Sequence, residues 1–376
     1  MSSLAALPLF TGSSTYARSI RNSAESSPIN FVLDGYFFEP KQYIKKLQEI
    51  EAQSGIQSDF YSAGGVVKEL EQKFCEITGK ERAMYMPSGT MANELSIRIL
   101  CGNKTKAIVH DQSHIYRDEG DSAQAIHNKR LVPIDTGKHF FTVNDLSDKI
   151  ETLKQGEVFY DGVGAISIEN PVRRHFGKIV DLEHIKSISA YAHENEIKTH
   201  LDGARIHLAA AYSGIPVKEY CSYFDTAYIS LYKYLGAAGG AILCGDHNTM
   251  DQMSHFMKIL GGTVFRSWTN ASMALHFLDG LDQRLSLMLN QSNELLKKLN
   301  DLDELQMNTV ANGSNVVKLT SKHIKLETFA NEMNASGIML KSPQNEEIEM
   351  HLNETILART NEELLSYFKS SIKKSK

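Results

Sequence analysis

The chain has 376 residues, of which 42% are apolar and 23% are charged, and its formal net charge is -5 at pH 7. This length is too great for one small core and indicates two domains. The mild negative charge excludes a general attraction to nucleic acid or to anionic membranes. No segment approaches the roughly 18 consecutive apolar residues that a membrane-spanning helix needs. The proportions of apolar and charged residues are ordinary for a soluble globular protein.

The four cysteines are widely spaced and form no C-x-x-C pair. This spacing argues against a zinc site or a disulfide framework, so we expect no metal. It also favours a reducing compartment such as the cytoplasm. The short apolar segment Leu4–Phe10 leaves open the alternative of a trimmed export signal.

The first three quarters of the chain alternate short apolar segments with amphipathic ones. Residues 11–30 are rich in small polar residues and predict a loose arm. A helical pattern begins at Gln42, and Val66–Ile77 repeats apolar residues at helical steps until Gly79. Strands are then predicted at Arg82–Met86, Ala107–His110, Val163–Ile168, Ile197–Asp202, Thr226–Lys233 and Gly240–Cys244, and helices at Met91–Leu100, Leu182–His193 and Arg205–Ala211. This alternation predicts an α/β domain around a mostly parallel sheet.

A different pattern follows in the last quarter. Helices are predicted over Thr269–Leu302, including one long helix at Leu275–Leu302. Strands are then predicted at Ser314–Leu319 and Thr355–Ala358, on either side of a helix at Leu326–Ser336. We therefore divide the chain into an N-terminal arm (residues 1–44), a large domain (45–284) and a small α+β C-terminal domain (285–376).

Two predicted strands end on residues of opposite charge, Asp202 and Lys233. A pyridoxal 5'-phosphate (PLP) enzyme requires such a pair, because the amine forms a Schiff base and the carboxylate keeps the pyridine nitrogen protonated. Asp202 has an ordinary alternative as a helix cap, and Lys233 as a surface lysine. However, Lys233 follows an apolar segment, and burial of an unused ammonium is costly. The pair therefore favours PLP chemistry.

The ends of two earlier strands carry further polar residues. Pro87-Ser88-Gly89-Thr90 leads directly into a helix, where small residues let backbone N–H groups cradle a phosphate. The same residues also suit an ordinary helix start. After the next strand, His114 is followed five positions later by Glu119. Its ring could stack on an aromatic cofactor, and a loop histidine held by local hydrogen bonds is the alternative.

Taken together, these segments resemble the threonine aldolase / β-eliminating lyase family of fold-type I PLP-dependent enzymes, as a divergent branch. The matching segments are Pro87–Asn93, His114 with Glu119, Ser167–Asn170, His200–Arg205, Ser230–Lys233 and Leu260–Gly262. The resemblance implies a fold-type I PLP-transferase-like large domain and bound PLP. It also implies a homodimer or homotetramer, and an amino-acid substrate.

The resemblance also implies roles for individual residues. Lys233 would be the Schiff-base lysine, Asp202 the partner of the pyridine nitrogen, and His114 the stacked ring and candidate base. The phosphate would be cradled by Ser88, Gly89 and Thr90. The substrate carboxylate would be bound by Arg205 through a bidentate pair, together with Arg173.

Several positions depart from the family pattern. Leu33-Asp34-Gly35-Tyr36 stands where aldolases carry a serine that touches the substrate carboxylate, and Val158–Asp161 lacks their second histidine. Tyr232 replaces the serine that usually precedes the lysine. Arg359 is the nearest candidate for a C-terminal carboxylate-binding arginine. Arg266, displaced by one position, is the nearest candidate for an arginine that reaches a phosphate across the dimer.

The resemblance leaves more than one reaction open. The first hypothesis is retro-aldol cleavage of a β-hydroxy-α-amino acid to glycine and an aldehyde, with His114 as base and Tyr160 or a water as alternatives. The same cofactor also supports β-elimination, racemisation or transamination. A non-catalytic binding protein that keeps the fold is the remaining alternative.

Overall fold

The computed structural model describes residues 28–376. The segment Leu4–Phe10 and most of the predicted arm lie outside the described residues. The chain forms two compact units. The larger comprises Gly35–Gln283 and Thr309–Val316, and the smaller comprises residues 28–34, Arg284–Asn308 and Val317–Lys376. The division into domains at residues 44 and 284 stays a prediction.

The larger unit is built on a seven-stranded sheet of strand order β2-β8-β7-β6-β5-β3-β4. Only β8 among these strands runs against its neighbours, and the other six are parallel to one another. The strands are β2 (Arg82–Met86), β3 (Lys106–His110), β4 (Arg130–Ile134), β5 (Val163–Glu169), β6 (Lys198–Asp202), β7 (Thr226–Ser230) and β8 (Ala241–Gly245). Every residue of β3, β5, β7 and β8 is buried, as expected for a parallel sheet covered on both faces.

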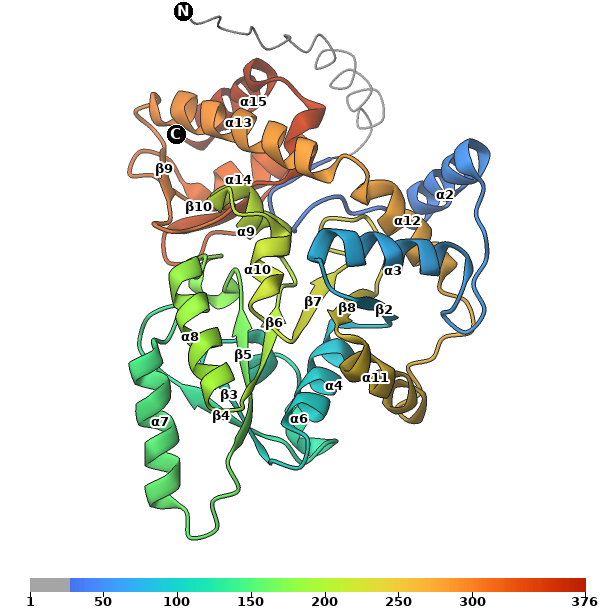
Figure 1. The fold of residues 1–376 in the computed structure, drawn as a ribbon. Coiled ribbons are helices and arrows are strands. Elements are labelled where there is room, and N and C mark those ends of the chain that lie inside the picture. The colour runs from blue at the N-terminus through green and yellow to red at the C-terminus, as the bar shows by residue number, and fades with distance from the viewer. Residues whose placement is uncertain (1–27) are drawn as a thin grey trace, which may run out of the picture. The chain divides into compact units, whose positions relative to one another are not determined.

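Helices cover both faces of this sheet (Figure 1). Of the helices that contact the sheet, α4 and α11 lie on one face, and α3 and α8 on the other, with α7 packed on α8. The helices of this unit are α2 (Pro40–Ser54), α3 (Gly65–Thr78), α4 (Gly89–Cys101), α5 (His114–Arg117), α6 (Ser122–Ala125), α7 (Val143–Gly156), α8 (Leu182–Glu194), α9 (Ile206–Ser213), α10 (Val217–Ser222), α11 (His247–Ile259) and α12 (Trp268–Leu278). A methionine-rich core, which includes Met84, Met86, Met250 and Met253, fills the space between α4, α11 and the sheet.

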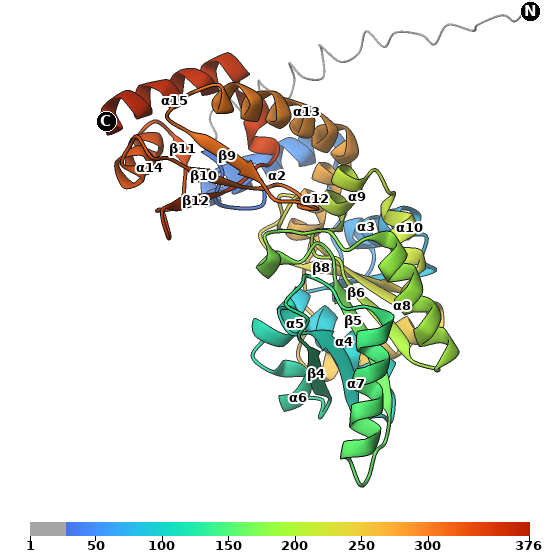
Figure 2. The ribbon, with the colours of Figure 1, turned by 90° about the vertical axis from the view of Figure 1, so that its left-hand side faces the viewer.

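The smaller unit combines helices with two small sheets (Figure 2). It contains most of α13 (Leu281–Asn300), with α14 (Leu326–Ala335) and α15 (Asn361–Ser375) packed together through the rings of Phe329 and Phe368. One sheet pairs β1 (Ile29–Asn30) with β11 (Ile338–Met339) in parallel. The other has the order β12-β10-β9, with β9 at Gln306–Thr309, β10 at Val316–Thr320 and β12 at Glu347–His351.

Local sequence signals explain where several elements begin and end. Helix α3 ends at Gly79, whose left-handed φ of 69° suits glycine and whose N–H donates to the Cys75 carbonyl. Helix α7 begins at a capping box in which Thr142 and Asp145 satisfy each other's backbone N–H groups. The predicted alternation of strands and helices from Arg82 to Cys244 is confirmed within one or two residues, with the exception of β7.

Three predicted elements were wrong. Strand β7 ends at Ser230, so Lys233 lies three positions beyond the strand, in the turn that leads to β8. The long helix predicted at Leu275–Leu302 is interrupted at Gly280, whose φ of 66° is incompatible with a continuous helix. Residues 354–358 form a 3-10 helix (η2, Glu354–Ala358) rather than a strand, because the Asn353 side chain accepts from the Thr355 N–H and starts a turn. None of the helices within residues 28–376 is both long enough and apolar enough to cross a membrane.

Candidate active site

Polar side chains converge at the carboxyl ends of the parallel strands in the larger unit. Asp202 ends β6, and its register partners are Glu169 at the end of β5 and Tyr228 in β7. Lys233 follows β7, and Ser88 follows β2 by two residues. Because ligands of open α/β sheets bind beyond the carboxyl ends of the strands, this edge is the candidate active site.

Asp202 and Lys233 are both buried. The exposed fraction is 2% for Asp202 and 7% for Lys233. Asp202 Oδ1 accepts from the Ala204 N–H (3.2 Å) and Oδ2 accepts from Asn93 Nδ2 (3.3 Å). Lys233 Nζ lies 5.3 Å from the centroid of the Tyr232 ring. An acid and an amine held in a largely water-free environment have the chemistry that PLP requires of a protein.

The start of α4 suits a phosphate group. Ser88 is the N-cap, and its Oγ accepts from the Met91 N–H (3.2 Å). A Cβ added at Gly89 would overlap the hydroxyl of Tyr228, so only glycine allows this close approach. Burial, followed by the charge of Asp202, raises the pKa of Tyr228 well above its ordinary value, which keeps the phenol protonated and able to donate. The helix N-terminus supplies backbone N–H groups that favour an anion.

His114 begins α5 and is held by two carboxyl groups. Its backbone N–H donates to Glu169 Oε2 (2.8 Å), and its Nδ1 lies 3.1 Å from Glu119 Oε1. Burial lowers the pKa of His114, but the hydrogen bond to Glu119 and the negative charges of Asp202, Glu119 and Glu169 outweigh it, so the pKa is raised. His114 is therefore suited to take up a proton.

Glu169 connects two loops at this edge. Its Oε1 accepts from the Arg173 N–H (2.9 Å) and its Oε2 from the His114 N–H. Burial, followed by repulsion from Asp202, raises the pKa of Glu169 to about 7. The positive charge of Arg205 opposes this shift, which indicates that Arg205 lies close enough to Glu169 to affect its pKa.

The structure brings some predicted residues to this edge and holds others elsewhere. The Arg173 backbone lies beside Glu169, while its guanidinium, like that of Arg174, pairs with Asp118. Gly35 passes beside Lys233, because a Cβ there would lie 2.8 Å from the Lys233 carbonyl oxygen. The Tyr160 ring is 5.3 Å from Lys106 Nζ, and Lys106 opens β3, so Tyr160 belongs to the opposite, amino edge of the sheet.

The two remaining arginines have other contacts. Arg266 donates to the Asp59 carbonyl and stacks on the ring of Phe265, 4.6 Å from its centroid. Arg359 lies in the smaller unit, where it donates to the carbonyl of Ala358 (3.0 Å). The roles implied for these two arginines stay predictions.

Sequence reasoning assigned no role to four residues of this site: Asn93, Glu169, His200 and Tyr228. Glu169 ends β5 and could have been found from that position alone. Asn93 lies one helical turn after the small residues that start α4, so it projects from the same part of the helix. Tyr228 and His200 lie inside strands and became relevant only through their tertiary contacts.

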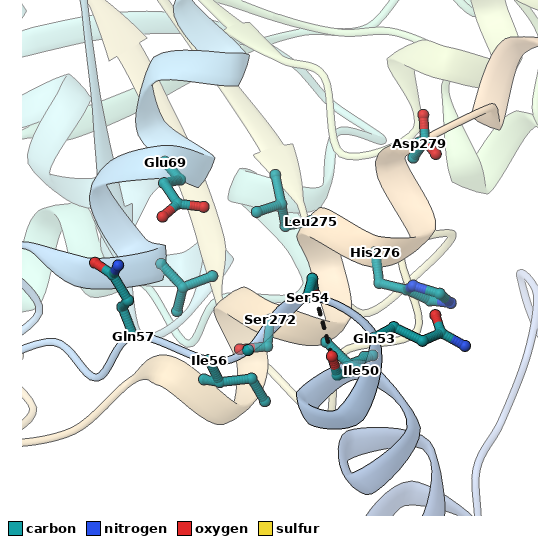
Figure 3. A pocket seen from close by; sticks show the side chains of 12 residues that line it. Ile50, Gln53, Ser54, Ile56, Gln57, Glu69, Ser272, Leu275, His276 and Asp279 are labelled. Carbon is teal, nitrogen blue, oxygen red and sulfur yellow. Dashed lines mark hydrogen bonds between the residues drawn. The ribbon is translucent and has the colours of Figure 1, made fainter.

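A separate cavity of about 410 Å³ lies in the same unit between α2, α3 and α12 (Figure 3). Ile50, Ile56 and Leu275 give it apolar walls, with His276 and Glu69 among its polar residues. None of the predicted site residues lines this cavity. Among the described residues, no three histidine, cysteine or acidic side chains are grouped as a metal site.

The fold belongs to the fold-type I class of PLP enzymes. A Listeria monocytogenes protein solved as a candidate L-allo-threonine aldolase has a TM-score of 0.76 and 22% identity, over 95% of this chain and 99% of its own. Residues 42–322 match a family model that is described as "Beta-eliminating lyase". The chain is therefore a member of the beta-eliminating lyase family.

Two curated relatives differ in the reaction that their names give. The low-specificity L-threonine aldolase of Candida albicans is 33% identical over 228 residues, which cover 60% of this chain and 60% of the relative. The alanine racemase TOXG of Cochliobolus carbonum is 30% identical over 201 residues, or 51% of this chain and 49% of the relative. The match thus spans less than two thirds of the length of either relative.

Proposed function

We propose that this protein is a PLP-dependent lyase of the threonine aldolase type, which cleaves a β-hydroxy-α-amino acid to glycine and an aldehyde. The observation that carries the proposal is the buried pair of Asp202, which ends β6, and Lys233, in the turn after the neighbouring strand β7. The names of the aldolase relatives support the type of reaction. When bound, PLP supplies an electron sink that stabilises negative charge on the α-carbon of the substrate.

The residues at this edge fit such a cofactor. Lys233 would hold it through its side-chain amine, and Asp202 would face its pyridine nitrogen. The start of α4 would bind its phosphate through Ser88, Gly89 and Thr90. The position of these residues at the N-terminus of α4, with Ser88 as its N-cap, supports this assignment, because backbone N–H groups there favour an anion.

His114 is the proposed base for the β-hydroxyl group. Glu119 accepts from Nδ1 of His114, which leaves Nε2 to take the hydroxyl proton of the substrate. A water is the alternative base, whereas Tyr160 lies at the other edge of the sheet. We assign the substrate carboxylate to Arg205, with Arg173 as a second cation.

Racemisation is the second candidate reaction, and the alanine racemase relative favours it. The two reactions break different bonds at the α-carbon. The anchors of the carboxylate decide which bond is weakened, because they set the orientation of the substrate. A panel of amino acids, assayed in parallel for aldehyde, pyruvate and inverted stereochemistry, separates cleavage from racemisation and from β-elimination.

We also propose a homo-oligomer whose interface includes an exposed aromatic cluster, defined as Phe60, Tyr61 and Phe265. The exposed fractions are 58%, 47% and 52%, and the ring centroids lie 4.8–5.4 Å apart. The loop that carries Phe60 and Tyr61 and the loop that carries Phe265 are both rigid, because the buried Asp59 carboxylate accepts from the N–H groups of Ser62 and Ser267. A rigid, exposed aromatic patch of this kind is typical of an interface.

The location that we propose is the cytoplasm. All four cysteines lie among the described residues as free thiols, and three of them are buried. Free thiols are usual in a reducing compartment.

The decisive experiment compares the wild type with Lys233→Ala. The wild type is expected to take up PLP with a visible absorbance band and to become covalently labelled on borohydride reduction. Lys233→Ala is expected to lose the label. Lys198→Ala is the matched control, because Lys198 is exposed and opens β6 at the opposite edge. Equal labelling of Lys233→Ala and wild type would overturn the proposal.

A further inference from the structure

A continuous chain of hydrogen bonds runs beneath the candidate active site. Thr226 Oγ1 lies 2.8 Å from His200 Nδ1, and His200 Nε2 lies 2.9 Å from Asn93 Oδ1. Asn93 Nδ2 then donates to Glu119 Oε1 (2.8 Å) and to Asp202 Oδ2 (3.3 Å). Both Asn93 and His200 have an exposed fraction of 0%. One amide group thus connects two carboxyl groups, and its orientation depends on a histidine.

The amide can make these contacts in one orientation only. A rotation by 180° would turn its carbonyl oxygen towards Glu119 and Asp202, which is repulsive. In the observed orientation Oδ1 faces His200, so His200 must carry its proton on Nε2. Nδ1 of His200 then accepts from the Thr226 hydroxyl. Burial lowers the pKa of His200 to about 4, so the ring is neutral at physiological pH and a single tautomer is defined.

The two carboxyl groups that share the amide have different tasks in the proposed function. Asp202 would face the pyridine nitrogen, and Glu119 orients His114 through the same Oε1 atom that accepts from Asn93. A lost donor would leave two buried, mutually repelling carboxyl groups less well compensated. The Asn93 amide therefore fixes the distance between Asp202, which would face the pyridine ring, and Glu119, which orients the proposed base His114.

We propose that Asn93 is a positioning residue, oriented by His200 and Thr226, that holds Asp202 and Glu119 in the arrangement that the cofactor needs. The inference rests on the proposed function and deepens it. Asn93 acts through other side chains, and its substitution is therefore expected to change the state of bound PLP as well as the rate.

The test uses two pairs of variants of the full-length protein. Asn93→Ala removes the bridge, whereas Asn93→Asp keeps the shape and replaces the donor with an acceptor. His200→Gln keeps an N–H near the position of Nε2, whereas His200→Asn loses it. His207→Asn is the matched control, because His207 is 4% exposed and neither ring nitrogen has a hydrogen-bond partner among the described residues.

Two readouts separate positioning from general stability. The first is the dissociation constant of PLP, measured by equilibrium dialysis. The second is the ¹⁵N shift of the pyridine nitrogen of labelled PLP on the protein, which reports how strongly Asp202 holds its proton. Both Asn93 variants and His200→Asn are expected to weaken PLP binding by about tenfold or more, since hydrogen bonds to charged groups are worth this much. They should also move the ¹⁵N shift, whereas His200→Gln and His207→Asn stay close to wild type.

A measurement on the protein without cofactor examines the hydrogen bonds between Thr226, His200 and Asn93 themselves. In the apo protein with ¹⁵N-labelled histidine, the signal of His200, assigned by its loss in His200→Gln, is expected to show protonated Nε2 and unprotonated Nδ1. The opposite tautomer would overturn the inference. So would Asn93 variants that fold and bind PLP with an unchanged ¹⁵N shift and affinity.

Failure of the proposed function has a different signature. A wild type that takes up no PLP overturns both proposals. A wild type that binds PLP normally, with variants that match it, overturns the inference alone. If Asn93→Ala does not fold, the comparison of His200→Gln with His200→Asn decides, because both residues are polar and differ in where they present the N–H group.

Discussion

Glu169 and Asp202 are register partners at the carboxyl ends of β5 and β6, and both carboxyl groups are buried. Different donors hold them: the N–H groups of Arg173 and His114 for Glu169, and Asn93 and the Ala204 N–H for Asp202. Burial and this proximity raise the pKa of Glu169 to about 7. One acid of the pair can therefore be neutral at physiological pH while its neighbour serves the cofactor.

The raised pKa of Glu169 predicts a pH-dependent stability. The folded protein holds this proton up to about pH 7, whereas the unfolded chain releases it near the ordinary value of 4.5. The contribution of Glu169 to the free energy of unfolding is thus fully present below about pH 4.5 and is lost as pH rises through 7. Glu169→Gln removes this loss.

We compare the free energy of unfolding of Glu169→Gln with that of wild type. The difference is expected to shift in favour of the variant by on the order of 1–3 kcal/mol as the pH rises from 5 to 8. Urea unfolding of both proteins at the two pH values measures this difference. A difference between variant and wild type that is the same at pH 5 and pH 8 would contradict the assignment of the shift to Glu169.

The close approach of Gly89 to Tyr228 predicts a strict requirement for glycine. Gly89→Ala would force the Tyr228 ring and the start of α4 apart, which disturbs the proposed phosphate cradle. We expect PLP affinity to fall at least ~10-fold and stability to fall by about 1–3 kcal/mol. Dialysis and thermal unfolding measure the two effects.

Gly156→Ala provides the control for that substitution. Gly156 ends α7, and an added Cβ there would meet no atom within 4 Å. The expected result is unchanged affinity with equal or slightly higher stability. If Gly89→Ala behaves in the same way as Gly156→Ala, the predicted close contact is wrong.

The position of His114 predicts separate effects on binding and on rate. His114→Phe keeps a flat ring for stacking but cannot accept a proton. We expect PLP to bind within a few-fold of wild type while kcat for aldehyde release falls ~100- to 10,000-fold. Stopped assays with a β-hydroxy amino acid measure the rate. A variant with wild-type kcat would assign the proton to a water.

The aromatic cluster predicts a dependence of the oligomeric state on Phe265. Phe265→Ser removes a ring that is in contact with Phe60 and Tyr61. We expect a shift towards monomer, measured by sedimentation velocity over a range of concentrations. Phe159→Ser is the control, because Phe159 is 94% exposed and outside the cluster. An equal effect of both substitutions would rule out a specific interface at the cluster.

The sequence by itself determined the α/β alternation, the start of α4 and the position of Asp202 at a strand end. The spacing of apolar residues and the residues at turns specify these features locally, as Gly79 specifies the end of α3. The sequence also singled out His114 and Glu119 as two polar residues five positions apart after a strand, and the structure shows their contact. Local signals of this kind do not depend on the rest of the chain.

Only the tertiary structure decided which distant side chains meet. Asn93 comes from α4, His200 from the middle of β6 and Thr226 from β7, and nothing in their spacing predicts one hydrogen-bonded relay. Strand pairing also decided that β7 ends at Ser230, so that Lys233 follows the strand. These relations depend on how strands pair across the sheet, and pairing is a long-range property that a local pattern does not contain.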